Sequence, residues 1–449
     1  MLRKRWLWLA LLAVVLIGGV GTYLLYPRLI LAAHERYPDA VPNQLLFLVA
    51  TPLPTALPAP TMAADGNQLA AISEQLADLQ PTATPSPVPT LPPTFTPQFQ
   101  SSGQQPDTPE PTALIGPTTA TTPLPPTPTP LPTAVRLENI NIIPQKFNNC
   151  GPANLTITLG YHGVVVDQLE VGDAVKPNYD DRNVSPWELV DYVNYETPLQ
   201  ARYLVGGTEV LLKQLIAAGY PVIIEKGLYP NAWEGWMGHY LTVVGYDDTS
   251  QEFISLDTFL GPWDSSGRRD SYDTVDEFWQ MFNYTVILVY PPEDETRVLS
   301  LLPPQLVDPV QMWQQTAVTN QQLTTTQPDN PYVWFNLGSS LTHLARLTNN
   351  ATLYTSAAAA FDQARTIGLP WRMLWYQFEP YEAYLESGRL EDVFTLSDAI
   401  LSTEGGYTVE ETHLYRSLAY TAQGNEAAAN AALATALELN PNLQLPIDN

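Results

Sequence analysis

The sequence predicts an α+β domain followed by an all-α helical repeat domain, both preceded by a transmembrane helix and a disordered linker rich in proline and threonine. Three observations support this: an uncharged apolar run near the N-terminus, a Pro/Thr-rich stretch from about residue 51 to 133, and a change from β-branched runs to Ala/Leu-rich text near residue 304. The expected boundaries are 1–27 for the anchor, 28–133 for the linker, 134–296 for the α+β domain and 304–449 for the repeats.

The N-terminal run from Trp6 to Tyr26 is about 21 residues long, enough for a helix that crosses a ~30 Å hydrocarbon core. Arg3, Lys4 and Arg5 precede it and are expected to stay in the cytoplasm, so the rest of the chain is expected outside, anchored by one pass through the cell membrane. A cleaved signal sequence is the alternative. The run is longer than the usual apolar segment of about 7–15 residues, which favours an uncleaved anchor.

The Pro/Thr-rich stretch predicts an extended spacer, because it lacks the large apolar residues that offset chain entropy. About 80 such residues at ~3.1 Å each would reach on the order of 200 Å. One interruption, GNQLAAISEQLADLQ, carries Leu69, Ile72, Leu76 and Leu79 at helical spacing. It predicts a short amphipathic helix or a weak self-association seam.

Charge and cysteine content narrow the functional classes. The net charge is -26 with a pI near 4.3, and no dense Lys/Arg stretch follows the N-terminus, so a nucleic-acid partner is not expected. The single cysteine excludes intrachain disulfides and Cys-rich metal sites. Asp247, Asp248 and Asp264 are scattered turn residues unlike an EF-hand loop, so neither a metal nor another cofactor is expected. The classes of partner that remain are a peptide, a protein or a glycan.

The segment 134–291 has features of both helices and strands. The runs YPVIIEKGLY, HYLTVVGYDD, EFISLDTF and YTVILVYP predict strands late in the segment. Earlier, SPWELVDYVNYE predicts a helix with Ser185 as N-cap, Pro186 in the first turn and Glu188 completing a capping box. Helices first and an antiparallel sheet later indicate a compact α+β domain.

The C-terminal segment alternates helical stretches and short turns at about 35 to 40 residues per pair. This text resembles tetratricopeptide repeats in its start pattern, its second helix and its recurring Asn-Pro. The matching residues are Trp334, Leu337, Gly338, Ala360, Phe361 and Ala364, with Asn-Pro at 330 and 440. The resemblance implies a curved solenoid whose concave face holds a protein partner. The alternative is a helical cap on the preceding domain.

The lone Cys150 is either a buried small hydrophobe or a nucleophile. Gly151 and Pro152 follow it, and proline favours the first turn of a helix, which would run to about Tyr161. A helix N-terminus lowers a thiol pKa. The alternating apolar residues from Leu155 to Leu159 also fit a strand, so periodicity alone leaves both open.

A nucleophilic cysteine needs an imidazole, and His239 is the candidate that elimination leaves among five histidines. His34 follows the anchor, and His162 is about 18 Å along a helix from Cys150. The remaining two, His343 and His413, fall in the repeats. A hairpin centred near residue 248 places Asp257 opposite His239, where it would orient the ring. A polar pair at the sheet rim is the alternative.

Gln145 stands five residues before Cys150. Its amide and the backbone N–H of the nucleophile would stabilise the oxyanion of acyl transfer by about 3 kcal/mol per donor. Tyr229, Trp233 and Trp236 lie close to His239 in sequence and either wall a substrate groove or fill the core.

These residues together resemble the papain-fold cysteine peptidases, and most closely the branch that processes bacteriocin leaders at double-glycine sites. The matching text is Gln145-x4-Cys150-Gly-Pro-Ala, Gly-His239-Tyr leading into Val-Val-Gly-Tyr-Asp, and Asp257 after the next strand, over about residues 138–291. The resemblance implies Cys150 as nucleophile, His239 as base and acid, Asp257 as its orienting group, Gln145 in the oxyanion hole and a helix after the cysteine.

The chain departs from that branch in three respects. Asn149 stands where an acidic residue is frequent, and Thr258 where proline is frequent. Transporter members of the branch carry six membrane helices and a nucleotide-binding domain, whereas this chain has one predicted membrane segment and no P-loop signature. The prediction is therefore a membrane-anchored, extracytoplasmic cysteine peptidase that acts on a peptide or protein substrate. A non-catalytic binding module with the repeats as interaction surface, and acyl transfer to an amine, are the alternatives.

Overall fold

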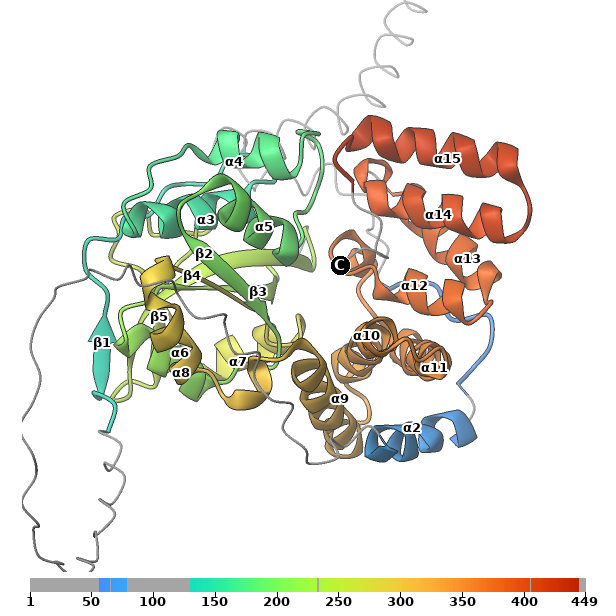
Figure 1. The fold of residues 1–449 in the computed structure, drawn as a ribbon, viewed down its shortest axis with the longest axis horizontal. Helices are drawn as coiled ribbons and strands as arrows, with labels where there is room; N and C mark the ends of the chain where they lie inside the picture. The colour runs from blue at the N-terminus through green and yellow to red at the C-terminus, as the bar shows by residue number, and fades with distance from the viewer. Residues whose placement is uncertain (1–55, 65, 79–129, 232–233, 404, 444–449) are drawn as a thin grey trace, which may run out of the picture. The chain divides into compact units, whose positions relative to one another are not determined.

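The computed structural model describes residues 56–64, 66–78, 130–231, 234–403 and 405–443. Apart from residue 130, they belong to one compact unit, in which an α+β region precedes an all-α region (Figure 1). The predicted membrane span Trp6–Tyr26 and most of the predicted linker lie outside the described residues. Among the residues that are described, no helix is long and apolar enough to span a bilayer.

The α+β region is built on one antiparallel sheet. Its strands are β1 (Ala134–Arg136), β2 (Gln200–Leu204), β3 (Val222–Leu228), β4 (Met237–Asp247), β5 (Glu252–Leu256), β6 (Arg268–Ser271) and β7 (Val286–Tyr290). The spatial order is β2-β7-β3-β4-β5-β6, with β1 paired to one end of β4. The four predicted strands are β3, β4, β5 and β7, and their antiparallel arrangement is confirmed. The other three strands, β1, β2 and β6, each contain arginine and no long apolar run, so their sequences lack a strand signal.

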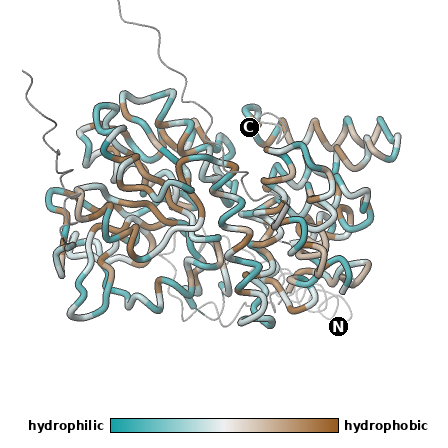
Figure 2. Tube along the Cα trace, turned by 60° about the horizontal axis from the view of Figure 1, so that its bottom comes forward, coloured by the Kyte–Doolittle hydropathy of each residue, from teal (hydrophilic) through white to brown (hydrophobic). Residues whose placement is uncertain are grey.

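Helices cover both faces of this sheet. They are α3 (Cys150–Tyr161), α4 (Gln168–Val175), α5 (Pro186–Glu196), α6 (Glu209–Ala217) and α7 (Tyr272–Gln280). Helices α3, α4 and α5 share a core with Ile223, Tyr240 and Ile287 of the sheet. Helix α6 packs with the neighbouring positions Ile224 and Leu241, which point to the opposite face because strand side chains alternate. Figure 2 shows hydrophobic residues concentrated inside both regions.

The predicted capping box forms at the start of α5. The Glu188 carboxylate accepts a hydrogen bond from the backbone N–H of Ser185 at 2.7 Å, and Pro186 occupies the first turn. This pairing satisfies a backbone donor that a helix N-terminus otherwise leaves open. It also fixes the direction in which α5 leaves the loop beside Cys150.

The C-terminal part is all-α, as predicted, and consists of helical hairpins. Its helices are α8 (Glu295–Leu301), α9 (Pro309–Thr326), α10 (Pro331–Thr348), α11 (Thr352–Ile367), α12 (Glu379–Glu386), α13 (Leu390–Leu401), α14 (Glu410–Ala422) and α15 (Glu426–Leu439). Successive helices pack as neighbours from α9 to α15. At the tightest point, a Cβ on Gly338 of α10 would come within 2.7 Å of the Phe361 ring on α11. Glycine therefore permits the close approach of these two helices, which is consistent with a repeat domain.

The prediction of a disordered linker over 28–133 is wrong for residues 56–78. Leu57 N donates to the Leu369 carbonyl at 2.9 Å, and Arg365 donates to the Pro58 carbonyl at 3.0 Å. Helix α2 (Gly66–Asp78) follows and buries Ile72 and Leu76 against the all-α region. The predicted amphipathic helix is thus confirmed, but its apolar stripe is covered by α9 and α11 of the same chain rather than by a second copy.

Candidate active site

Cys150 is the first residue of α3, so the predicted helix after the cysteine is confirmed over its full expected length. The backbone beyond it is buried, and a Cβ on Gly151 would overlap Val184. Glycine therefore lets the helix start pack directly against the loop before α5 and against the Tyr240 ring. The thiol itself keeps partial exposure. A partly accessible sulfur at a helix N-terminus is the setting in which thiolates are stabilised.

His239 lies on β4 and its Nε2 is 3.0 Å from Oδ1 of Asp257. Both side chains are almost fully buried. The same Oδ1 accepts backbone hydrogen bonds from Phe259 and Leu260, at 3.0 and 2.8 Å. Toward Cys150, the charge of His239 and its hydrogen bonding lower the thiol pKa. The predicted base and carboxylate are therefore in contact, and the predicted nucleophile lies near enough to the base for its pKa to respond.

The register that brings Asp257 to His239 differs from the predicted one. The β4–β5 ladder pairs Thr242 with Leu256, and a bulge lies between Val243 and Gly245. Asp257, one residue beyond β5, is consequently not directly opposite His239. Continuing the ladder places Asp257 opposite Leu241, two residues from His239 and on the same face of the sheet. Such diagonal neighbours remain within reach of long side chains, so the contact forms despite the register error.

The electrostatics favour a charge-separated pair. Burial raises the pKa of the Cys150 thiol, but the hydrogen bond and charge of His239, helped by the backbone N–H groups of Tyr240 and Gly151, lower it below its usual value overall. Burial lowers the pKa of His239, yet Asp257 and Cys150 raise it to about 9. Asp257 keeps a pKa of about 2, because His239 and two backbone donors outweigh its burial. Both shifts favour a thiolate beside an imidazolium over a neutral pair.

Gln145 reaches the site through a short polar network. Its backbone N–H donates to the Thr258 carbonyl at 2.9 Å, and its Oε1 accepts from the Thr258 hydroxyl at 2.9 Å. Asn154 on α3 donates both to that hydroxyl, at 3.2 Å, and to the Cys150 carbonyl, at 2.9 Å. No described residue accepts a hydrogen bond from the Gln145 Nε2, which is left to donate elsewhere.

Sequence reasoning missed the parts of this network beyond Gln145. In the sequence, Thr258 stands out only as a departure from a related family, and Asn154 only as part of a helix. A polar residue buried four positions after Cys150 on the same helix face is a signal that points back at the thiol. Asn149, the other departure, is buried and donates to the Gln168 carbonyl at 2.9 Å, so it ties the start of α3 to α4.

The aromatic residues near His239 divide between core and surface. Trp236 is buried and stacks on Phe282 with ring centroids 5.8 Å apart, so it belongs to the core and does not wall a groove. Tyr229 is exposed, and Trp233 lies outside the described residues. The all-α region supplies a different aromatic neighbour. Tyr376 packs its ring against the backbone of Gly238, the residue before His239.

Comparisons with known proteins found matches to the α+β region. Residues 137–287 match the model of the family described as Peptidase_C39 like family. A putative C39-like peptidase from Bacillus anthracis has a similar solved structure (21% identity, TM-score 0.29, covering 35% of this chain and 96% of that chain). So does the peptidase domain of Streptococcus ComA, a bi-functional ABC transporter involved in quorum sensing (17% identity, TM-score 0.27, covering 34% and 99%). No curated protein matches the chain.

The α+β region is a papain-like cysteine peptidase domain. More particularly, residues 137–287 form a domain of the C39-like peptidase family, which confirms the family that the motifs around Cys150 and His239 predict. The all-α region and helix α2 lie outside the matched segment. In the described part of the chain, no three His, Cys, Asp or Glu side chains are grouped to hold a metal ion.

Proposed function

We propose that this protein hydrolyses peptide bonds with Cys150 as nucleophile, His239 as general base and acid, and Asp257 as the group that orients His239. The observation that supports this best is the 3.0 Å contact between His239 and Asp257, together with Cys150 at the N-terminus of α3, where His239 lowers the thiol pKa. Asp257 holds Nε2 of the ring, which leaves Nδ1 to face the thiol. This division of the two ring nitrogens is what a base between a nucleophile and a carboxylate requires.

In the first half of the reaction the Cys150 thiolate attacks the carbonyl carbon of the scissile peptide bond. A C–S bond forms, and the carbonyl electron pair moves to oxygen. When the tetrahedral species collapses, the C–N bond breaks and the His239 imidazolium gives its proton to the leaving amine. The products of this half are a free amine, a thioester on Cys150 and a neutral His239.

In the second half His239, now neutral, takes a proton from water as the water oxygen attacks the thioester carbonyl. The C–S bond breaks, the thiolate leaves and the carboxylic acid product departs. Cys150 and His239 return to their starting charges, so no external oxidant, reductant or cofactor enters the balance.

The oxyanion formed in both halves would receive two donors, the Nε2 amide of Gln145 and the backbone N–H of Cys150. Thr258 supports this assignment because its hydroxyl bonds Oε1 of Gln145 and so turns the NH₂ group outward. One donor of this type is typically worth about 3 kcal/mol in the transition state.

We also propose that the protein is anchored by the apolar run Trp6–Tyr26 with its peptidase domain outside the cytoplasm. The docking of Leu57 and Pro58 on the all-α region changes the expected reach. Only residues 28–55 separate the anchor from this docked segment, and at ~3.1 Å each they would extend less than about 90 Å, not the ~200 Å of the full linker.

Because Cys150 is the one thiol in the chain, labelling with a membrane-impermeant maleimide tests on which side of the membrane the domain lies. We expect labelling on intact cells; labelling only after lysis contradicts the proposal.

The catalytic proposal is tested by the alkylation rate of Cys150 against pH, on the full chain and on His239→Ala. We expect rapid alkylation that persists well below the ordinary thiol pKa of ~8.5 and is lost in the variant. A rate that follows an ordinary thiol titration in both proteins contradicts a thiolate–imidazolium pair. Cys150→Ser, which cannot be alkylated, controls for reaction at other side chains.

A further inference from the structure

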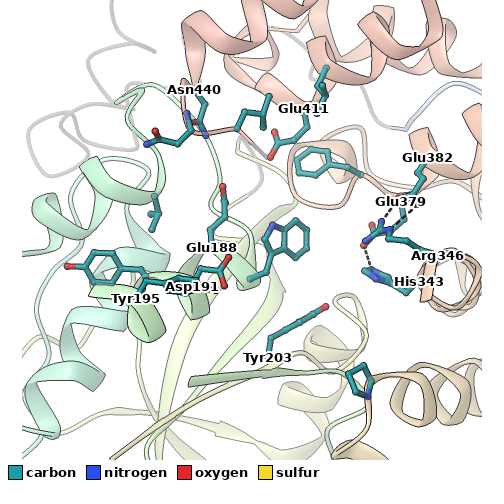
Figure 3. A pocket seen from close by; sticks show the side chains of 18 of the residues that line it. Glu188, Asp191, Tyr195, Tyr203, His343, Arg346, Glu379, Glu382, Glu411 and Asn440 are labelled. Atoms are coloured by element: carbon teal, nitrogen blue, oxygen red, sulfur yellow. Dashed lines mark hydrogen bonds and ion pairs between the residues drawn. The ribbon is translucent and has the colours of Figure 1, made fainter. Parts of the chain in front are cut away.

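A cavity of about 540 Å³ lies between the peptidase domain and the all-α region. Figure 3 shows how its wall is assembled: Glu188 and Asp191 project from α5, Tyr203 from β2, His343 and Arg346 from α10, and Glu411 from α14. This volume is in the range of pockets that hold a small ligand or several side chains of a peptide. Cys150 is not part of its lining.

Aromatic rings form much of the wall. They come from both regions of the chain and comprise Trp187, Tyr192, Tyr195, Tyr203, Trp313, Phe378 and Tyr415. The faces of such rings carry partial negative charge and attract cations within about 6 Å. Within the wall, the Trp313 ring stacks on the His343 ring with centroids 3.8 Å apart.

Acidic side chains outnumber basic side chains on the wall of the cavity. Arg346 is held by Glu382, with Nε 3.2 Å from Oε1, and His343 is held by Glu379 at 3.1 Å. No lysine lines the cavity, and within the described part of the chain Glu188, Asp191 and Glu411 form no salt bridge. Carboxylates that are partly withdrawn from water and form no salt bridge are costly in free energy.

The pKa values of two of these acids are raised above their usual range. Burial, the charge of Glu410 and that of Asp191 raise the pKa of Glu188 to about 8. Burial and the neighbouring acids Glu410 and Asp181 raise the pKa of Glu411 well above its usual value. An incoming cation would supply the missing charge and allow these groups to ionise.

A small recess of about 20 Å³ adjoins the cavity and shares Trp187, Tyr203, Trp313 and Glu379 with it. Two polar side chains that line this recess are buried, and each has one oxygen without a hydrogen-bond partner among the described residues. They are Glu225, whose side chain is 3% exposed and whose Oε1 is unpaired, and Ser339, which is 2% exposed and whose Oγ is unpaired.

An unpaired carboxyl oxygen and an unpaired hydroxyl in a space of this size can hydrogen-bond one small polar group. An unpaired buried acceptor costs roughly 1–3 kcal/mol, so the arrangement is stabilised when a donor enters. The recess has room for about one water-sized group, such as the end of an amine-bearing chain.

We propose that this cavity binds a lysine or arginine side chain of a peptide, held by the aromatic rings and the carboxylates of Glu188, Asp191 and Glu411. A long apolar stem packs on aromatic rings while its cationic head meets the acids, which suits these two residues. The further statement that this peptide is the substrate rests on the proposed peptidase function.

The recess connects the cavity to the peptidase chemistry. Glu225 of β3 pairs with Tyr240 of β4, next to the pair of Lys226 with His239. Tyr376 lines the recess and also packs on Gly238 beside His239. The negative charge of Cys150 contributes to the raised pKa of Glu225. These contacts link the wall of the recess to the strand that carries His239.

The first test measures binding to the full-length Cys150→Ala protein, which cannot turn the peptide over. The probe is a fluorescein-labelled tetralysine peptide, compared with the same peptide bearing N-acetyl-lysines. We expect at least tenfold tighter binding of the lysine form, and a loss of about tenfold in Asp191→Asn and in Glu411→Gln.

The matched control is Glu426→Gln, an exposed acid in the first turn of α15 that makes the same change in net charge. With a net charge of -26, the main rival explanation is general attraction of any polycation. Equal binding of both peptides, or equal weakening in the control and in the cavity variants, overturns the proposal.

A second measurement separates this inference from the proposed function. With wild-type protein, cleavage of peptides with lysine or with N-acetyl-lysine upstream of the scissile bond is compared by mass spectrometry, beside the alkylation profile of Cys150. An ordinary thiol profile together with selective lysine binding means that the site stands and the peptidase proposal fails. A reactive thiol with no preference for lysine in binding means that the inference fails and the peptidase proposal stands.

Discussion

Asp257 holds His239 from a position diagonal to it on the sheet, with Oδ1 3.0 Å from Nε2 and two backbone N–H groups on the same oxygen. This contact fixes which ring nitrogen faces Cys150. It also keeps the pKa of Asp257 at about 2, so the carboxylate stays charged throughout the working pH range.

Asp257→Asn should therefore lower kcat/KM by about 10²- to 10⁴-fold, because an amide neither fixes the required tautomer nor stabilises the imidazolium. The measurement is steady-state cleavage of a peptide found in the substrate search. Asp273→Asn, an exposed acid in the first turn of α7, is the matched control and should retain wild-type rates. An active Asp257→Asn enzyme would show that the carboxylate is a structural group only.

The pH dependence of kcat/KM should be bell-shaped. The acid limb reports ionisation of Cys150, whose pKa is lowered, and the alkaline limb reports loss of the His239 proton near pH 9. In Asp257→Asn the alkaline limb should move to lower pH, because the charge that raises the His239 pKa is gone. An alkaline limb that does not move in this variant contradicts the assignment of that limb to His239.

Gln145→Ala should reduce kcat by about 10²- to 10³-fold with little change in KM, since an oxyanion donor acts mainly in the transition state. Thr258→Val removes the hydroxyl that holds Oε1 of Gln145 and should produce a smaller loss in the same direction. Thr258→Ser keeps the hydroxyl and should restore most of the rate. A Thr258→Val enzyme with unchanged kcat would show that Gln145 does not depend on this bond.

Glu188→Gln should make thermal stability less dependent on pH. The pKa of Glu188 is about 8 in the folded chain and ~4.3 when unfolded, so the folded state keeps a proton that the unfolded chain releases between these values. The free energy of unfolding must fall as pH rises through that window. We expect the variant to gain at least about 2–4 °C in Tm at pH 8 relative to wild type, and little at pH 4. Equal pH profiles in scanning fluorimetry contradict the raised pKa.

Residues 56–78 should stabilise the all-α region. Leu76→Ala removes a buried side chain of α2 and is expected to cost about 2–5 kcal/mol. Met62→Ala, at an exposed position of the same segment, is the control and should have almost no effect. Limited proteolysis should then cut within 56–78 faster in Leu76→Ala. A variant as stable and as protected as the control would show that α2 is not held on α9 and α11.

Several parts of the fold and the site follow from the sequence because their signals are local. The capping box predicts helix α5, and continuous apolar runs predict β3, β4 and β7. The order of Gln145, Cys150, His239 and Asp257 is a motif that indicates the peptidase family. The register of β4 and β5 differs from the predicted one because the turn is centred later than residue 248: Asp247 pairs with Glu252, and the bulge near Val244 then shifts the remaining pairs by one residue toward the prediction.

Other features depend on contacts between segments far apart in the chain. The role of Thr258 requires Gln145 to lie beside it, 113 positions earlier in the sequence. The sequence does not predict the docking of Leu57, because the residues around it have the Pro/Thr-rich composition of a spacer. Only the contacts of this segment with Leu369 and Arg365 show why it is held. The cavity has one wall on α5 and another on α10 and α14, so no single stretch of sequence contains its pattern.

The sequence by itself determined the chemistry of this protein: one thiol, one suitably placed histidine, and motifs whose order indicates a C39-like peptidase. Local spacing and composition suffice for that, because helix starts, strands and motif residues are set by neighbours in the chain. Tertiary structure alone decided how Asp257 reaches His239, where α2 packs, and that acids and aromatic rings from two regions enclose a cavity beside Glu225. Those outcomes depend on the packing of distant segments against one another, which residue spacing along the chain does not encode.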